Sequence, residues 1–96
     1  MLCDRFKELR EEIELNQEEF AKKINVSRST YANYEVGRTE PSISILIDIA
    51  NFYGVSVDYL CGNTNIKEPY YKDNRLCEYI NKCLMIYKEF LHNKKP

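Results

Sequence analysis

Four side chains in the stretch from Arg28 to Val36 carry groups that can bind the edge of a nucleic-acid base. The guanidinium group of Arg28 can donate two parallel hydrogen bonds to guanine, and the amide of Asn33 can pair with adenine through two hydrogen bonds. The hydroxyl of Ser29 can bond to either base, and Ala32 can contact the methyl group of thymine. The alternative for each is an ordinary solvated side chain or a helix cap. The stretch is therefore a candidate surface for reading bases.

A short helix over this stretch would separate an inner face from an outer face. With about 100° between successive residues, the side chains that cluster inward are those of Ser27, Tyr31 and Tyr34. The side chains that remain outward are those of Ser29, Ala32, Asn33 and Val36, and Arg28 is exposed at the open first turn. All four base-binding candidates are therefore exposed, so the helix predicts a single reading surface.

Asn25 decides whether this helix follows a sharp turn. A preceding helix should begin after Asn16, because "NQEE" resembles a capping box, and its inner face consists of Phe20, Ala21 and Ile24. Asn is the residue after Gly that best tolerates a left-handed backbone, so Asn25 can reverse the chain. Ser27 can then cap the next helix, and Gly37 can end it. We expect two short helices that cross over a tight turn, with the small Ala21 at their approach.

Apolar spacing predicts helices on both sides of this pair. Before it, an amphipathic helix ending near Leu15 would bury Leu2, Phe6, Leu9 and Ile13. After it, Pro41 and Ser42 start a fourth helix with one apolar face formed by Ile43, Leu46, Ile47, Ala50 and Tyr53. A second apolar face of that helix consists of Ile45, Ile49 and Phe52, so either the core surrounds it or a partner covers it. Ser56 and Gly62 bound a short fifth helix.

The carboxyl-terminal region predicts a longer amphipathic helix after a linker from Asn63 to Tyr71. Its apolar residues are spaced as in a coiled-coil seam and are Leu76, Ile80, Cys83, Tyr87 and Phe90, with Leu84 and Leu91 widening the stripe. Dimerisation through this stripe is the interpretation we favour. The alternative is a helix that folds back onto its own domain.

Composition limits the function classes. With 96 residues the chain fits one helical domain over residues 1–64 and a linker with a carboxyl-terminal helix over residues 65–96. The four cysteines lack C-x-x-C spacing and the single histidine is His92, so we expect reduced, buried thiols, no metal, no cofactor and no enzyme. No secretory signal and no membrane span is visible, which makes the cytoplasm the expected location. The net charge is −1, but the segment from Asn16 to Thr39 is mildly positive between two negative neighbours.

Three segments, "RFKELREE", "QEEFAKKINVSRSTYANYEVGRTEPS" and "IANFYGVSVDYLCG", resemble the lambda-repressor-like helix-turn-helix family of the Cro/repressor or xenobiotic-response-element type. The resemblance covers about residues 5 to 62 and matches five helices in order. Asn25 stands where Gly is usual. Tyr31 stands where a smaller aliphatic residue is usual, and it could bring its hydroxyl to the surface.

The resemblance implies an all-α, compact five-helix domain that binds double-stranded DNA with the helix from Arg28 in the major groove. It implies phosphate contacts from Gln17 before the turn and from Arg38 and Thr39 after the reading helix. It also implies a partly buried salt bridge between Arg10 and Glu35. The complete set of expected DNA-binding residues is Gln17, Arg28, Ser29, Thr30, Ala32, Asn33, Arg38 and Thr39.

One such domain reads too few base pairs to find a single site in a genome, so we expect a homodimer on a palindrome. The leading hypothesis is a homodimeric transcriptional regulator that acts as a repressor. The alternative is an antitoxin-like or adaptor protein whose carboxyl-terminal helix binds another protein. The low net charge favours the alternative, and the polar face of Arg28, Ser29 and Asn33 favours the regulator.

Overall fold

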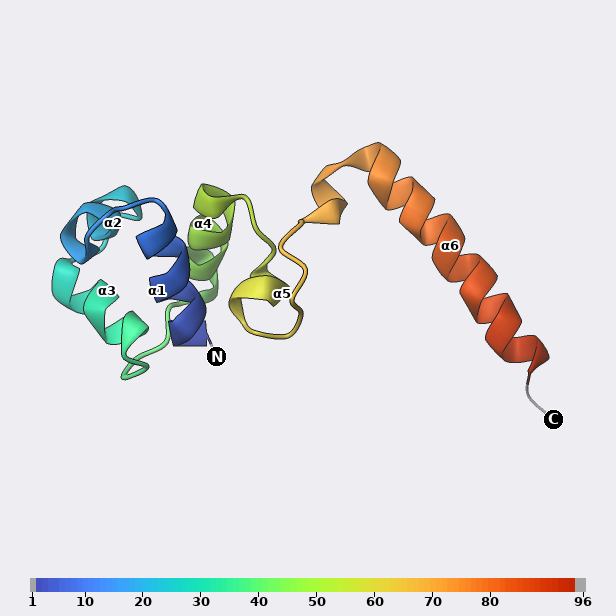
Figure 1. Ribbon diagram of the computed structural model, residues 1–96, viewed down its shortest axis with the longest axis horizontal. Helices are drawn as coiled ribbons and strands as arrows, with labels where there is room; N and C mark the ends of the chain where they lie inside the picture. Colours follow the sequence, from blue (N-terminus) through green and yellow to red (C-terminus); the bar gives the residue numbers. More distant parts are fainter. Residues whose placement is uncertain (1, 95–96) are drawn as a thin grey trace.

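The computed structural model describes residues 2–94, and the side chains from Asp4 to Lys94. Over these residues the chain is helical and forms no strand. The elements are α1 (Leu2–Glu12), α2 (Gln17–Lys23), α3 (Arg28–Glu35), α4 (Ile43–Tyr53), α5 (Val57–Leu60), the 3₁₀ turn η1 (Tyr70–Lys72) and α6 (Asn74–Asn93). Helices α1 to α5 pack together at one end, and α6 projects away from them (Figure 1). The predicted fold class, five compact helices followed by a longer one, is confirmed.

Polar side chains begin the helices where the sequence indicates. At Asn16 both halves of the capping box form, because Glu19 N donates to Asn16 Oδ1 over 2.8 Å and Asn16 N donates to Glu19 Oε1 over 2.9 Å. The hydroxyls that accept a backbone N–H at the start of α3, α4 and α5 are those of Ser27, Ser42 and Ser56. Each cap satisfies a donor that the first helical turn leaves unpaired, so local chemistry fixes these helix starts.

Asn25 makes the turn between α2 and α3 as predicted. Its φ angle is 61°, in the left-handed region, and Val26 N then donates back to Ala21 O over 3.0 Å. The chain turns away from α2 there, and α3 begins three residues later, at Arg28. The helix-turn-helix is therefore present.

The predicted end of α1 is wrong by one turn. The helix stops at Glu12 instead of near Leu15, and Glu14 takes a left-handed backbone with φ 57°. Ile13, predicted on the inner face, is 43% exposed because the chain has already left the helix there. The helix-end carbonyls find local partners, since Glu14 N donates to Glu11 O. Leu2, the first residue of the predicted inner face, lies outside the described side chains.

Aromatic rings fill the centre of the five-helix domain. Phe20 on α2 contacts Tyr31 of α3 edge-on at 5.0 Å and stacks against Tyr53 of α4 at 5.1 Å between ring centroids. The other buried apolar residues are Phe6, Leu9, Ala21, Ile24, Tyr34, Ile49, Ala50, Val55, Tyr59 and Leu60. Full burial of one large side chain contributes roughly 1.5–3 kcal/mol, so this core accounts for the packing of α1 to α5.

Helix α4 is covered on one side only. Ile49 and Ala50 are buried, and Ile45, Leu46 and Tyr53 pack against the core. Ile43 and Ile47, predicted on one inner face, are 78% and 44% exposed, and Phe52 is 42% exposed. The core of this chain therefore does not surround α4, because α5 and the aromatic cluster occupy just one of its faces.

Arg5 fastens the predicted linker to the domain. Its guanidinium group donates to Tyr59 O and Thr64 O over 3.0 and 3.1 Å, and to Asn65 Oδ1 over 2.8 Å. The same group lies 3.8 Å from the centre of the Tyr59 ring. Beyond it, Ser56 N donates to Lys67 O over 2.9 Å. The loop after α5 therefore follows the domain surface, and the Lys72 ammonium group contacts Asn51 on α4.

Helix α6 does not fold back onto α1 to α5. It packs against η1, and none of its residues from Asn74 to Asn93 is buried. Two of the thiols predicted to be buried, those of Cys61 and Cys83, are exposed, and that of Cys77 is half-buried. They lie on surfaces that this chain alone does not cover. The side chain of Cys3 lies outside the described ones.

Candidate nucleic-acid interface

The exposed side of α3 carries the predicted base-binding residues. Arg28 and Ser29 are exposed, while Thr30, Ala32 and Asn33 are half-buried beside the rest of the domain. The inward direction of Tyr31 and Tyr34 is confirmed, since both are buried. The structure thus brings Arg28, Ser29 and Asn33 to the outer side of one short helix, at the end of the molecule away from α6 (Figure 1).

Ser27 is exposed, so its predicted inward direction is wrong. The hydroxyl is turned to the helix start, where it accepts from Thr30 N over 3.1 Å and donates to Thr30 Oγ1 over 2.7 Å. It also lies 3.2 Å from Ser29 Oγ. At the N-cap of α3 the hydrogen bond to the first helical turn, and not the helical-wheel angle, sets the direction of the Ser27 side chain. In the free protein the hydroxyls of Ser29 and Thr30 therefore already have a hydrogen-bonding partner, the hydroxyl of Ser27.

The turn after α3 folds Arg38 and Thr39 onto the end of that helix. Both backbone N–H groups donate to Asn33 O, over 2.9 and 3.4 Å. Gly37 makes this possible with φ 76°. Arg38 and Thr39 are exposed and directly follow the reading surface. Their position relative to Asn33 is therefore set by backbone hydrogen bonds.

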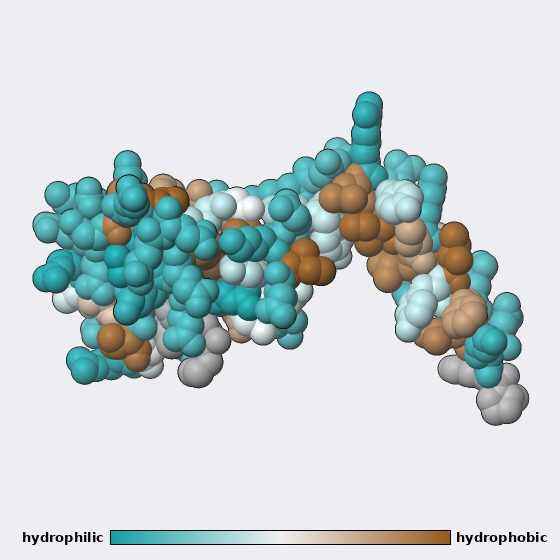
Figure 2. Space-filling model, viewed as in Figure 1, coloured by the Kyte–Doolittle hydropathy of each residue, from teal (hydrophilic) through white to brown (hydrophobic). Residues whose placement is uncertain are grey.

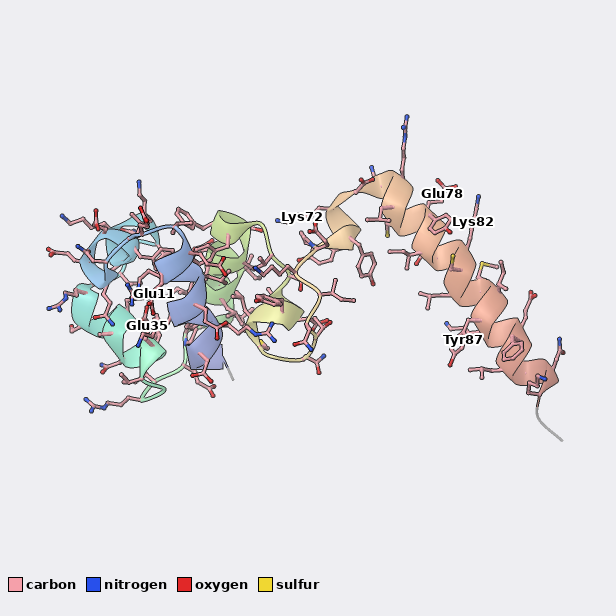
Figure 3. All side chains as sticks on the ribbon, in the orientation of Figure 1. Glu11, Glu35, Lys72, Glu78, Lys82 and Tyr87 are labelled. Atoms are coloured by element: carbon pink, nitrogen blue, oxygen red, sulfur yellow. The ribbon has the colours of Figure 1, made fainter. Side chains whose placement is uncertain are left out.

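The salt bridge implied between Arg10 and Glu35 is present and bidentate. Arg10 Nε donates to Glu35 Oε2 over 2.6 Å and Nη2 donates to Oε1 over 2.9 Å. The two side chains are 12% and 4% exposed, so the pair is almost closed to water. Arg10 Nη1 also donates to Leu15 O over 2.9 Å. One guanidinium group therefore joins α1, the turn after it and α3, and Figure 3 shows Glu35 between α1 and α3.

Gln17 belongs to the same network, which the sequence did not reveal. Its Nε2 donates to Glu35 Oε1 over 3.1 Å. Burial alone would raise the pKa of Glu35, but its polar contacts, above all the hydrogen bonds from Arg10, outweigh this effect and hold the pKa below the ordinary 4.5. The hydrogen bond to Glu35 in turn raises the pKa of Arg10. The carboxylate of Glu35 and the guanidinium group of Arg10 are therefore both charged at neutral pH.

A shallow hollow opens beside this network. It has a volume of about 330 Å³ and is lined by Arg10, Asn16, Gln17, Glu18 and Arg28. Two arginines and the acidic residue Glu18 thus line one surface depression. Gln17 and Arg28, which come from different helices, line the same hollow.

The hydroxyl of Tyr31 does not reach the surface, contrary to the expectation from the sequence. The residue is 0% exposed, and among the described residues neither its hydroxyl nor that of Tyr53 has a hydrogen bond of acceptable geometry. Burial raises the pKa of both phenols, and the nearby carboxylate of Glu35 adds to the effect. The larger ring is accommodated inside because it packs edge-on against Phe20.

No group of three or more His, Cys, Asp or Glu side chains in residues 4–94 is arranged to hold a metal ion. In the described part of the chain no helix has the length and apolar character needed to cross a membrane.

Comparison with known proteins identifies the family. A model described as Helix-turn-helix matches residues 6–60. The uncharacterized HTH-type transcriptional regulator YobD of Bacillus subtilis is 35% identical over 82 residues, which is 85% of this chain and 73% of that protein. The transcriptional repressor RstR of the cryptic phage CTXphi, from Vibrio cholerae, is 38% identical over 80 residues, which is 81% of this chain and 72% of that protein.

A solved structure agrees with these relatives. The crystal structure of a transcriptional regulator from Listeria innocua superposes with a TM-score of 0.62 at 25% identity, over 88% of this chain and 77% of that one. The geometry of α2, Asn25 and α3, the family match and the relatives coincide on the same residues. The chain belongs to the helix-turn-helix family of transcriptional regulators, of the Cro/C1 type.

Proposed function

We propose that this regulator is a repressor that binds a palindromic operator as a homodimer. One observation carries the proposal. The outer side of α3 presents Arg28, Ser29 and Asn33, and the residues expected to hold phosphates lie at both of its ends. Such an arrangement supports a short helix in the major groove with a contact to the DNA backbone on each side.

Base reading is assigned to the outer side of α3. Arg28 at the first turn donates to guanine, and Asn33 one and a half turns later pairs with adenine. The hydroxyls of Ser29 and Thr30 release their hydrogen bonds with Ser27 and bind base edges instead. Ala32 leaves room for a thymine methyl group. Each good bidentate contact is worth about 1–3 kcal/mol of discrimination between bases.

Phosphate binding is assigned to Gln17 on one side and to Arg38 and Thr39 on the other. The bond from Gln17 to Glu35 keeps its side chain in place beside Arg28. The bonds from Arg38 N and Thr39 N to Asn33 O keep the second group at a fixed distance from the reading surface. Contacts of this type orient the domain and carry no base preference of their own.

Dimerisation is assigned to α6. Two reading helices must lie roughly 34 Å apart to bind successive major grooves on one side of the duplex. The residues of the proposed seam are Leu76, Ile80, Cys83, Tyr87 and Phe90, and no residue of α6 is buried within one chain. We propose that the protein acts in the cytoplasm and has no catalytic role.

Selection of bound DNA from a random pool tests this function. Two inverted half-sites with a fixed spacing are the expected result, together with sedimentation of the free protein as more than one chain. A strict monomer that enriches no sequence would refute both parts.

A second function is favoured by the open apolar side of α6. The helix could bind another protein, as in an antitoxin or adaptor, with DNA binding secondary. A stoichiometric partner that is co-purified by the chain and lost on the substitution Tyr87→Glu, while the free chain stays monomeric, would favour this second function over the first.

A further inference from the structure

The apolar side of α6 is twice as wide as a coiled-coil seam requires. With about 100° between residues, it covers an unbroken arc of about 180°. The arc consists of Leu76, Cys77, Tyr79, Ile80, Cys83, Leu84, Ile86, Tyr87, Phe90 and Leu91. Figure 3 shows Tyr87 on one side of the helix and Glu78 and Lys82 on the other, and Figure 2 shows hydrophobic residues gathered along the length of α6.

A pair of α6 helices would cover only the middle of this arc. The seam residues from Leu76 to Phe90 occupy the two central positions of each heptad. The positions beside the seam remain at the edge of a two-stranded coil, where Glu and Lys are the usual residues. In α6 the residues at these flanking positions are Cys77, Leu84 and Leu91 on one side and Tyr79 and Ile86 on the other.

The flanking residues are strongly exposed. Tyr79 and Ile86 are 67% and 68% exposed, and Leu84 and Leu91 are 44% and 43% exposed. With about 200 Å² for a whole large side chain, these four leave on the order of 400 Å² of apolar surface on each chain. That area is as large as the largest apolar patch of a typical monomer. A simple helix pair would cover only part of it.

We propose that four copies of α6 form a four-helix bundle, so that two DNA-binding pairs share one assembly. The proposal extends the homodimer proposed above and rests on it. In such a bundle each helix buries its seam and its flanking positions against two neighbours. The occupant is this same chain, because the arc contains no charged side chain for recognising a partner of complementary charge.

The opposite half of α6 suits the outside of a bundle. Apart from Met85 it is polar within Asn74–Asn93, and its charges have both signs: Arg75, Glu78, Lys82, Lys88 and Glu89. The helix has 20 residues, so the bundle would be about 30 Å long. Helix α6 leads away from α1 to α5 (Figure 1), so these five helices do not cover the arc.

Sedimentation equilibrium of the full chain tests the proposal, with two neighbouring substitutions as a matched pair. Ile86 and Met85 are 68% and 64% exposed in the single chain, but only Ile86 lies within the arc. We expect the unmodified protein to have about four times the chain mass of 11.4 kDa. We expect Ile86→Lys to halve that mass and Met85→Lys to leave it unchanged.

Three results would overturn the bundle: an unmodified protein of two chains at every concentration, a protein of one chain, or equal masses for the two variants. A two-chain protein would leave the homodimer intact, whereas a one-chain protein would remove that as well. Selection of DNA by the Ile86→Lys variant separates the questions, because retained half-site selection shows that DNA reading does not depend on the bundle.

Discussion

Glu35 Oε2 of α3 lies 2.6 Å from Arg10 Nε of α1, and the two side chains are 4% and 12% exposed. The pair joins α3 to α1 across a distance of 25 residues in sequence. Removing one partner leaves the other charge buried without compensation, which is far more harmful than the loss of an exposed ion pair.

The substitution Arg10→Met should therefore lower the free energy of unfolding by about 3 kcal/mol, measured by urea denaturation. Lys82→Met is the matched control, since the Lys82–Glu78 pair is 71% exposed on both sides. We expect the control to change stability by less than about 0.5 kcal/mol. Equal effects of the two substitutions would show that the buried pair does not stabilise the fold.

The lowered pKa of Glu35 predicts a loss of stability in acid. A carboxyl group whose pKa is lowered by folding contributes its full stability above the ordinary pKa, here 4.5, and loses it as the pH falls through the lower folded value. The urea midpoint should fall between about pH 5 and pH 3, and Glu35→Gln should reduce this fall. A variant with the same acid profile as the unmodified protein would contradict the assignment.

The raised pKa of Tyr31 predicts the opposite dependence in alkali. The buried phenol resists ionisation, so stability is fully present below the ordinary pKa of 10.0 and is lost as the pH rises above it. Tyr31→Phe should make alkaline unfolding less steep. At neutral pH it should change the free energy of unfolding by less than about 1 kcal/mol, because it removes a hydroxyl without a good partner. A larger loss would mean that the hydroxyl is bonded after all.

Two non-glycine residues of the described chain have a left-handed backbone, and they differ in how well they tolerate it. Asn25 and Glu14 have φ angles of 61° and 57°. Glu14→Gly should stabilise the protein by about 1 kcal/mol, and Asn25→Gly by less, because Asn already tolerates this conformation. Asn25→Val should destabilise it by about 1–2 kcal/mol. Thermal unfolding of the three variants checks this order, and equal responses to the two Gly substitutions would refute it.

Arg28 and Arg38 should affect DNA binding in different ways. Arg28→Ala should relax the preference at one base position, with a loss of about 1–3 kcal/mol on the selected site. Arg38→Ala should weaken all sites alike and reduce the salt dependence by about one phosphate contact. Fluorescence anisotropy on the selected site and on point variants of it, over a range of salt concentrations, distinguishes the two. Identical effects of the two substitutions would contradict the assignment of Arg28 to base contacts and of Arg38 to phosphate contacts.

Local chemistry explains which parts of the fold were predictable. The capping box at Asn16, the cap at Ser27 and the reversal at Asn25 depend on neighbours in sequence, and all three form as expected. Apolar periodicity predicts neither the left-handed residue at Glu14, where the chain leaves α1, nor the inward direction of the Tyr31 hydroxyl, which depends on packing between helices. The Arg10–Glu35 pair came from family resemblance, since its partners are distant in sequence.

Predictability of the site follows the same division. The wheel placed Arg28, Ser29 and Asn33 on the outside of α3, and their DNA contacts remain predictions. The bond from Gln17 to Glu35 was missed because it needs α1, α2 and α3 to be in place. The exposure of Cys61 and Cys83 was missed because an apolar face can be recognised in the sequence, whereas its coverage by the same chain cannot.

The contacts of Arg5 imply an order of events during folding. Its bonds to Thr64 and Asn65 join residues 59 and 60 positions apart, among the longest loops that this domain closes. Long loops close at a greater entropic cost than local turns, and contacts across them form slowly unless other packing has already brought the ends together. We therefore expect the helix-turn-helix to form before Arg5 binds the loop that follows α5. The loop that leads to α6 would then be attached to the domain late in folding, through a residue that is synthesised early.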